Sequence, residues 1–266
     1  MVGTELPSRR GFRAISARWQ IAPRNEFGAM AGLIGILAGE VIATFTVGLT
    51  YLTVKHGASP STLLKDAAGL VGLWIGFVAT ALLAGPIERR RSPLRTRLVD
   101  DLGLSFRAID LPIGIAAGLF GQYVLAVLLE LPLYPFVPHL FHRLGEPARS
   151  LTGGESGTAL ALLGVLVCLG SPFVEELFFR GLFLRGLLGK ARGGLGWQAV
   201  PAVLGSSALC GAVFGLVHFE PLQLLALSGF GMLLALMACT TGRLGPGIVA
   251  HVTFNTVTFV ALATSH

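Results

Sequence analysis

Ionisable and amide side chains recur at helical spacing in the apolar C-terminal half of this chain. They form three patterns, Glu175-Glu176-x-x-x-Arg180, Phe214-x-x-x-His218 and His251-x-x-x-Asn255. A carboxylate can act as a general base toward water, and imidazole and amide N–H groups can donate to a developing oxyanion. These residue types therefore suit the hydrolysis of an amide bond.

Spacing separates the two glutamates of the first pattern. Glu176 and Arg180 are four residues apart with the acid first, the better order for a helical ion pair. Glu175 lies about 100° further round the helix and is not aimed at Arg180. We therefore expect a structural Glu176–Arg180 pair and a Glu175 that faces a cavity as general base. A solvated interfacial face that includes all three residues explains this segment equally well.

The dipeptide Ser171-Pro172 precedes this segment. Proline breaks or kinks a helix. We expect the helix to break or kink here and a new turn to begin, with both glutamates in the first turn that follows, where a helix N-terminus favours negative charge.

The two histidine patterns strengthen the catalytic interpretation. A lone histidine in an apolar helix is usually a hydrogen-bonded core residue. Here two such histidines, His218 and His251, occur with Asn255 and Glu175 in apolar stretches, and ionisable residues within a membrane are functional candidates by default. The spacing places His251 and Asn255 on one helical face. The other histidines lie in loops or at the terminus (His56, His139, His142 and His266).

The composition indicates a membrane environment and a fold class. Of the 266 residues 53% are hydrophobic and 13% charged, whereas soluble domains have roughly 25% charged residues. We predict an all-α, polytopic transmembrane helical bundle of about seven to eight spans, each near the roughly 20 residues that cross a bilayer. The expected spans are 28–54, 68–85, 111–131, 158–174, 198–217, 221–241 and 245–263. The stretch 175–190 would continue the fourth span or lie at its mouth.

The net charge of +6 does not indicate a nucleic-acid partner, because the basic residues lie in loops. Arginines are dense before the first span and between the second and third, and sparse in the intervening loops. The positive-inside rule predicts a cytoplasmic N-terminus. We interpret the first span as an anchor and the protein as an integral protein of the plasma membrane.

The chain divides coarsely into three parts. Residues 1–27 form a basic cytoplasmic segment, 28–157 an N-terminal transmembrane region, and 158–266 a compact core that holds nearly all the buried polar groups. Three cysteines, Cys168, Cys210 and Cys239, lie in apolar spans without metal-binding spacing, which favours buried apolar roles.

Taken together and in this order, the three patterns resemble the CAAX protease and bacteriocin-processing (CPBP, also called ABI) family of intramembrane proteases. The stretch "GFGMLLALMACTTGRLGPGIVAHVTFN" is also similar to the last two helices of that family. The resemblance covers about residues 158–260, so it implies a CAAX-protease-like catalytic core in the C-terminal half. The N-terminal half carries no resemblance.

The resemblance implies an intramembrane endopeptidase without a cofactor. Glu175 with His218 would activate the attacking water, His251 and Asn255 would hold the oxyanion, and Glu176, Arg180 and Phe214 would support the site. Its substrate would be a membrane-associated peptide or protein, CAAX-type or bacteriocin-related, and the surrounding lipid its other partner.

Three alternatives remain open. His218, His251 and Glu175 could bind a catalytic zinc ion, although the sequence lacks H-E-x-x-H. The protein could be a non-catalytic scaffold or bacteriocin self-immunity protein. It could also be a proton-coupled transporter in which Glu40 and Glu130 extend a relay.

Simple alternation of the spans conflicts with a single site. It puts Glu175 and His251 near the cytoplasmic side and His218 near the opposite side. If these residues meet, either 175–190 crosses or re-enters the membrane, or the helix before His218 begins later and is broken.

Overall fold

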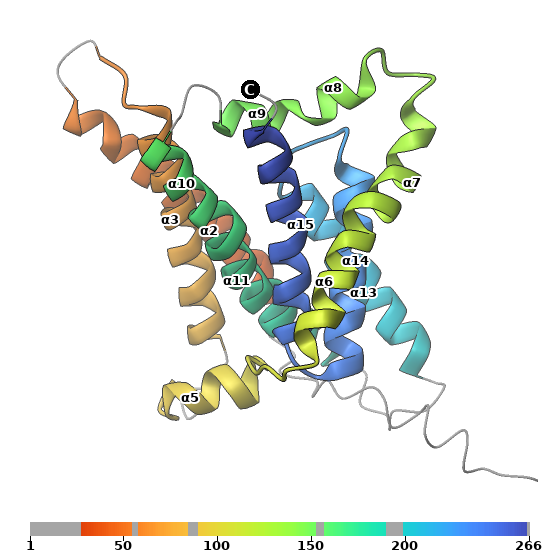
Figure 1. Ribbon diagram of the computed structural model, residues 1–266. Helices are drawn as coiled ribbons and strands as arrows, with labels where there is room; N and C mark the ends of the chain where they lie inside the picture. Colours follow the sequence, from red (N-terminus) through yellow and green to blue (C-terminus); the bar gives the residue numbers. More distant parts are fainter. Residues whose placement is uncertain (1–27, 55–57, 85–89, 153–156, 190–198, 265–266) are drawn as a thin grey trace, which may run out of the picture.

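The computed structural model describes residues 28–54, 58–84, 90–152, 157–189 and 199–264. These residues form helices, turns and loops and contain no strand, which confirms the predicted all-α transmembrane class (Figure 1). The N-terminal segment 1–27 and most of the Gly-rich stretch "GKARGGLGW" lie outside the described residues.

Among the described residues, five helical stretches are long and apolar enough to cross a membrane. They are Gly28–Thr53, Thr62–Leu83 (α3), Asp110–Leu133, Gly157–Leu188 and Leu224–Thr241 (α14). The first comprises α2 (Gly28–Thr50) and η1 (Tyr51–Thr53), and the third comprises α6 (Asp110–Phe120), η3 (Gly121–Leu125), α7 (Ala126–Glu130) and η4 (Leu131–Leu133). The fourth comprises α10 (Gly157–Val165), η5 (Leu166–Gly170), α11 (Ser171–Glu176), η6 (Leu177–Phe183) and α12 (Leu184–Leu188). Two further apolar helices are α13 (Val200–Leu216) and α15 (Gly245–Ala263), and the short elements are α5 (Leu94–Thr96), η2 (Arg97–Asp101), α8 (Leu140–Leu144) and α9 (Glu146–Thr152).

A full break at Ser171-Pro172, one of the two outcomes expected there, is wrong. Residues Gly157–Leu188 run as one continuous helical stretch of 32 residues. A π-helical turn, η5, ends immediately before Ser171 and accommodates the proline, so Glu175 and Glu176 lie in the middle of a long helix rather than at a new N-terminus. Residues 175–188 thus continue the fourth span, one of the two arrangements expected for the stretch 175–190.

The second span begins earlier than predicted. α3 starts at Thr62 instead of residue 68, because the Ser61 hydroxyl accepts a hydrogen bond from the backbone N–H of Leu64 at 3.2 Å and caps the helix. Lys65 and Asp66 therefore lie in the first turns of the helix.

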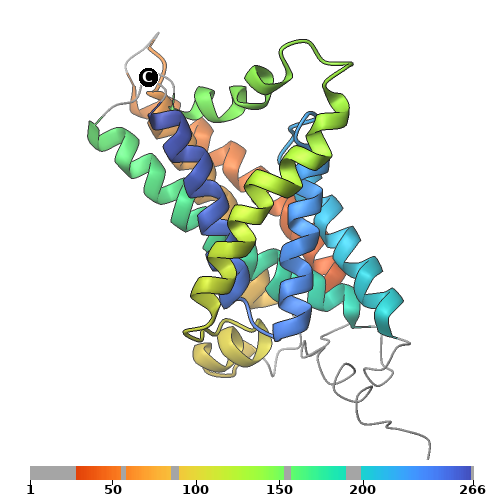
Figure 2. The same cartoon turned by 45° about the vertical axis from the view of Figure 1, so that its right-hand side comes forward.

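The helices define two ends of the bundle. α5, the start of α6 and the turn between α14 and α15 lie at one end, called here the α5 end; α8, α9 and the 217–223 loop lie at the other, the α9 end (Figure 1). α15 lies between the Gly157–Leu188 helix and the α6–α7 stretch in both views (Figure 2). It is therefore the central helix on which the other site elements converge.

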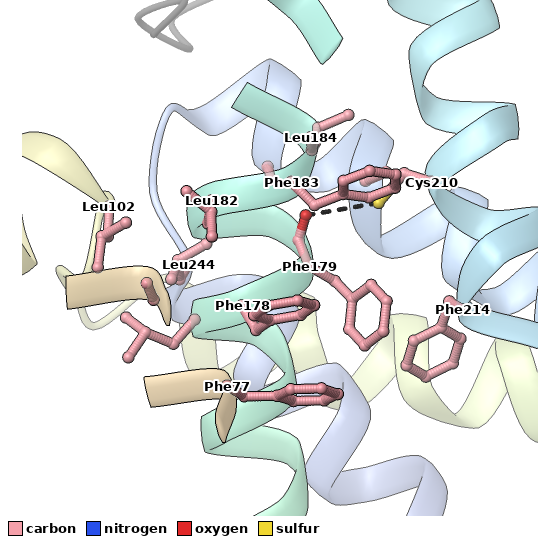
Figure 3. Packing of buried hydrophobic residues seen from close by; sticks show 14 of the residues in the cluster. Phe77, Leu102, Phe178, Phe179, Leu182, Phe183, Leu184, Cys210, Phe214 and Leu244 are labelled. Atoms are coloured by element: carbon pink, nitrogen blue, oxygen red, sulfur yellow. Dashed lines mark hydrogen bonds between the residues drawn. The ribbon is translucent and has the colours of Figure 1, made fainter. Parts of the chain in front are cut away.

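A row of aromatic rings forms the core between α3, η6 and α13 (Figure 3). Phe77 stacks on Phe178 with ring centroids 4.1 Å apart. Phe179 packs edge-on against both of them and against Phe214, whose ring centroid is 5.3 Å away. Such pairs add about 0.5–1.5 kcal/mol each beyond area burial. The row leads from the N-terminal spans to the polar residues around Phe214.

α2 joins this core through small residues. Gly39 of α2 and Gly76 of α3 face each other so closely that a Cβ on Gly76 would overlap the Gly39 backbone. Lipid is as apolar as leucine, so helices in a membrane gain from close van der Waals packing rather than from leaving the solvent. The glycine contact allows that close approach.

The α5 end is closed by a polar clamp ahead of α15. Gly242 adopts the left-handed conformation (φ 72°) that ends α14, as glycine does at many helix C-termini. The following Arg243 donates from Nε to both oxygens of the buried Asp110 at 3.0 Å, and this hydrogen bond raises the pKa of Arg243. The clamp fixes where α15 begins and hence the height of His251.

Candidate active site

One cavity of about 330 Å³ contains the four predicted catalytic residues in its wall. Glu175 comes from the Gly157–Leu188 helix, His218 from the turn after α13, and His251 and Asn255 from α15. At the α9 end the wall is completed by residues of α8, α9 and the loop before α14, namely Leu144, Pro147, Glu220 and Gln223. The cavity therefore runs from the α9 end into the middle of the bundle.

Behind the cavity wall lies a buried charged cluster centred on Glu176. Glu176 Oε1 accepts hydrogen bonds from Arg180 Nη1 at 2.6 Å and from His251 Nδ1 at 3.2 Å. Arg180 also donates from Nη2 to the Gly231 carbonyl at 2.9 Å. Glu176 and Arg180 are both 0% exposed. The expected Glu176–Arg180 pair is observed, and the solvated-face alternative is excluded for these two residues.

Glu175 faces the cavity rather than Arg180, as its angular offset from Glu176 predicts. Its side chain is 12% exposed and lines the cavity. Glu175 Oε2 lies 3.8 Å from His251 Nε2, beyond direct hydrogen-bond distance. Each nitrogen of the His251 ring thus faces a different carboxylate, with Glu176 at Nδ1 and Glu175 at Nε2.

Phe214 connects the two histidines. Its ring centroid is 4.7 Å from that of His218 and 5.5 Å from that of His251, and the Arg180 guanidinium carbon lies 4.6 Å from the ring centroid in cation–π geometry. The Phe214 carbonyl lies 2.6 Å from His218 Nδ1. Since a carbonyl can only accept, Nδ1 carries the proton and Nε2 of the neutral ring can accept another.

Asn255 lies one turn beyond His251 on α15, as predicted. Its Nδ2 donates to the Val167 carbonyl at 2.9 Å, so one of its two N–H groups bonds to the neighbouring helix. Asn255 also lines the cavity. An amide nitrogen carries two donors, so a second N–H remains for a group within the cavity.

The predicted alternation of the spans is compatible with a single site, because one elongated cavity reaches His218, Glu175 and His251. α13 is a 17-residue helix, so His218 lies just beyond its end toward the α9 side. The cavity extends from there to Glu175 and His251. The Phe214 ring spans the interval between the histidines, and His218 makes no hydrogen bond to Glu175 among the described residues.

Two carboxylates expected for a transport relay lie elsewhere. Glu40 belongs to α2 and Glu130 to α7, and neither lines the cavity. Four further polar residues of the wall were not predicted from the sequence, namely Ser171, Glu220, Gln223 and Thr258. Single hydroxyl or amide side chains in or near apolar helices carry no pattern that distinguishes them from helix-packing residues.

Within the described ranges, no group of three or more His, Cys, Asp or Glu residues is arranged to hold a metal ion. The three candidate zinc ligands line the same cavity, but only Glu175 and His251 form a close pair. Cys168, Cys210 and Cys239 are free and buried.

Comparison with known proteins identifies this region. Residues 157–257 match the family model of the type II CAAX prenyl endopeptidases, Rce1-like. This match confirms the resemblance: the C-terminal part of the chain is similar to Rce1-like hydrolases of the CAAX-protease type. The matched stretch contains all four predicted catalytic residues and excludes the spans before residue 157. No curated protein and no solved structure matches the chain.

Proposed function

We propose that the protein is an intramembrane endopeptidase that hydrolyses a peptide bond with a water molecule activated by Glu175. The observation that supports this most strongly is the shared cavity, in which a carboxylate, two imidazoles and an amide from three separate elements face one space. The Rce1-like match of the same residues points to the same chemistry.

Glu175 is the general base in this proposal. It is the only glutamate of the first pattern that faces the cavity, while Glu176 is engaged behind the wall. His218 assists from the α9 side, because its Nδ1–H is held by the Phe214 carbonyl and its Nε2 is left as an acceptor for a water proton. Glu175 takes one proton from the attacking water and returns it to the leaving amine.

His251 and Asn255 stabilise the oxyanion of the tetrahedral intermediate. The Glu176 and Glu175 carboxylates lie at Nδ1 and Nε2 of His251 respectively. In this proposal the ring donates from Nδ1 to Glu176 and from Nε2 into the cavity. Asn255 adds its second amide N–H from one turn further along α15. Donors fixed in advance at the position of developing charge are often the largest catalytic contribution.

The substrate is a membrane-associated peptide or protein, CAAX-type or bacteriocin-related. The wall includes many apolar side chains, among them Leu163, Val167, Leu227, Phe230 and Phe259. These suit an apolar segment of substrate, and the polar residues gather where the peptide bond would lie.

The N-terminus faces the cytoplasm in this proposal. Among the described residues, the α5 end carries Arg90, Arg91, Arg95, Arg97, Arg107 and Arg243, whereas the α9 end carries Lys65, Arg143 and Arg149. The positive-inside rule places the richer end in the cytoplasm. The cavity then opens toward the opposite side of the membrane.

Substrate trapping tests the proposal. Glu175→Gln protein is purified from its own membranes in mild detergent beside wild type and Glu40→Gln, which removes a membrane carboxylate outside the cavity. We expect Glu175→Gln to enrich a membrane protein that the wild type and Glu40→Gln cleave and Glu175→Gln does not. Equal cleavage by all three, or no cleavage of any enriched protein by wild type, would overturn the proposal.

A further inference from the structure

The anchor of Asn255 depends on an unusual backbone carbonyl. In a regular α-helix the Val167 carbonyl accepts the N–H of the residue four positions later, Ser171. Here the Ser171 N–H bonds instead to the Leu166 carbonyl, five positions earlier, in the π-helical turn η5. The Val167 carbonyl accepts from Asn255 Nδ2 at 2.9 Å.

Pro172 explains why no backbone donor takes that carbonyl. At π-helical spacing the donor to Val167 would be residue 172, and proline has no N–H. The proline ring also clashes with the carbonyl four residues earlier, that of Cys168, in a regular helix. The π-turn before Pro172 relieves this clash and moves the Ser171 N–H away from Val167.

We propose that Pro172 is a positioning residue for Asn255. By withholding a backbone N–H it keeps the Val167 carbonyl available, and that carbonyl holds one amide hydrogen of Asn255 so that the other is directed into the cavity. Pro172 is itself buried, three residues before Glu175 in the same helix, and its effect on the site passes through the Val167 carbonyl that anchors Asn255. This inference rests on the proposed function, in which Asn255 donates to the oxyanion.

The test is a double-mutant cycle of Pro172→Ala and Asn255→Ala in the full-length protein in detergent. Pro172→Ala is expected to fold, because alanine is the best helix former and proline the poorest. Its restored N–H lies at π-helical spacing from Val167 and can satisfy that carbonyl from the backbone in the existing register. Pro201→Ala is the matched control, since Pro201 is exposed in the first turn of α13, where no helix carbonyl awaits a donor.

We expect Asn255→Ala to lower kcat by about 100- to 1,000-fold, as loss of one oxyanion donor does, with KM within about twofold. Pro172→Ala should lower kcat by at least tenfold with the same small change in KM. The double variant should be no slower than Asn255→Ala alone, because Pro172 acts only through Asn255. Pro201→Ala should keep the wild-type kcat.

The outcomes distinguish failure of the positioning role of Pro172 from failure of the proposed function. A wild-type kcat for Pro172→Ala, or losses that multiply in the double variant, would overturn the positioning role. A wild-type kcat for Asn255→Ala would instead remove the oxyanion role from the proposed function. Melting temperatures of the same four proteins give a readout without activity. If the melting-temperature shifts of Pro172→Ala and Asn255→Ala simply add in the double variant, the Val167–Asn255 anchor is contradicted. A double-variant shift that differs from this sum would support the anchor.

Discussion

Glu176 is the residue on which the buried charges converge. Its Oε1 accepts from both Arg180 and His251, and none of the three side chains is more than 4% exposed. The i, i+4 spacing predicted the first bond because it is local. The second joins residues 75 positions apart, and no spacing rule reports a contact that only tertiary packing creates. The sequence thus supported a structural pair where the fold contains a triad.

Glu176→Ala is expected to destabilise the protein strongly. It leaves Arg180 and His251 without their shared acceptor, and removal of one partner from a buried ion pair costs about 3–5 kcal/mol. Glu176→Gln is the matched control, because its amide oxygen still accepts one hydrogen bond, and it should lose less. Thermal melting in detergent measures both. An unchanged melting temperature for Glu176→Ala with lost activity would make Glu176 a direct participant in catalysis.

Chelators are expected to leave the peptidase active. A catalytic zinc ion takes three protein ligands, and the described residues contain no such group arranged for a metal. Activity is measured after prolonged treatment with EDTA and with 1,10-phenanthroline. Inactivation that added zinc reverses would favour the alternative in which His218, His251 and Glu175 bind zinc.

At the scale of elements, helical periodicity and apolar length predicted most of the spans, and the largest error concerned a register change. The Ser171-Pro172 signal predicts a break or a kink with a new turn after it, whereas the helix continues through a π-turn. Proline forbids one backbone hydrogen bond but does not determine whether the helix stops or shifts by one residue. Packing of residues 177–188 against α2, α3 and α13 favours continuation.

The contact between α13 and α14 offers an element-scale prediction. A Cβ on Gly211 would meet the Ser228 carbonyl and the Met232 backbone of α14, while one on Gly205 of the same helix meets nothing within 4 Å. Gly211→Ala should therefore push α13 from α14, displace Phe214 and His218, and cost about 1–3 kcal/mol. Gly205→Ala should be neutral or stabilising.

Melting temperature and cleavage rate of the two alanine variants check this prediction. Because both changes gain the same helix propensity, their difference reports the helix contact alone. Equal melting temperatures and equal rates would contradict the account of how α13 positions His218.

At the scale of the whole molecule, the cavity and the arginine-rich loops occupy opposite ends. Loop charge could be read from the sequence, and it predicted the orientation of the N-terminus. The end at which the cavity opens could not be predicted from the sequence. It depends on tertiary packing, because α8, α9 and the 217–223 loop leave space between α15 and the Gly157–Leu188 helix.

Cysteine labelling in intact cells tests this orientation. Ser150→Cys introduces an exposed thiol at the α9 end and Ala108→Cys one at the α5 end, while the native cysteines are buried. A membrane-impermeant maleimide should label Ser150→Cys from outside and Ala108→Cys only in inverted vesicles. The reverse pattern would mean that the cavity opens to the cytoplasm.

The proposed activation of the attacking water by Glu175 can be measured directly. Its most direct test is the single-turnover cleavage rate of the trapped substrate by wild type, Glu175→Gln and Glu40→Gln with enzyme in excess. We predict that Glu175→Gln lowers the rate by about 100- to 10,000-fold, the usual contribution of a general base, with an unchanged melting temperature, and that Glu40→Gln retains the wild-type rate. A Glu175→Gln protein that cleaves as fast as wild type would contradict the account.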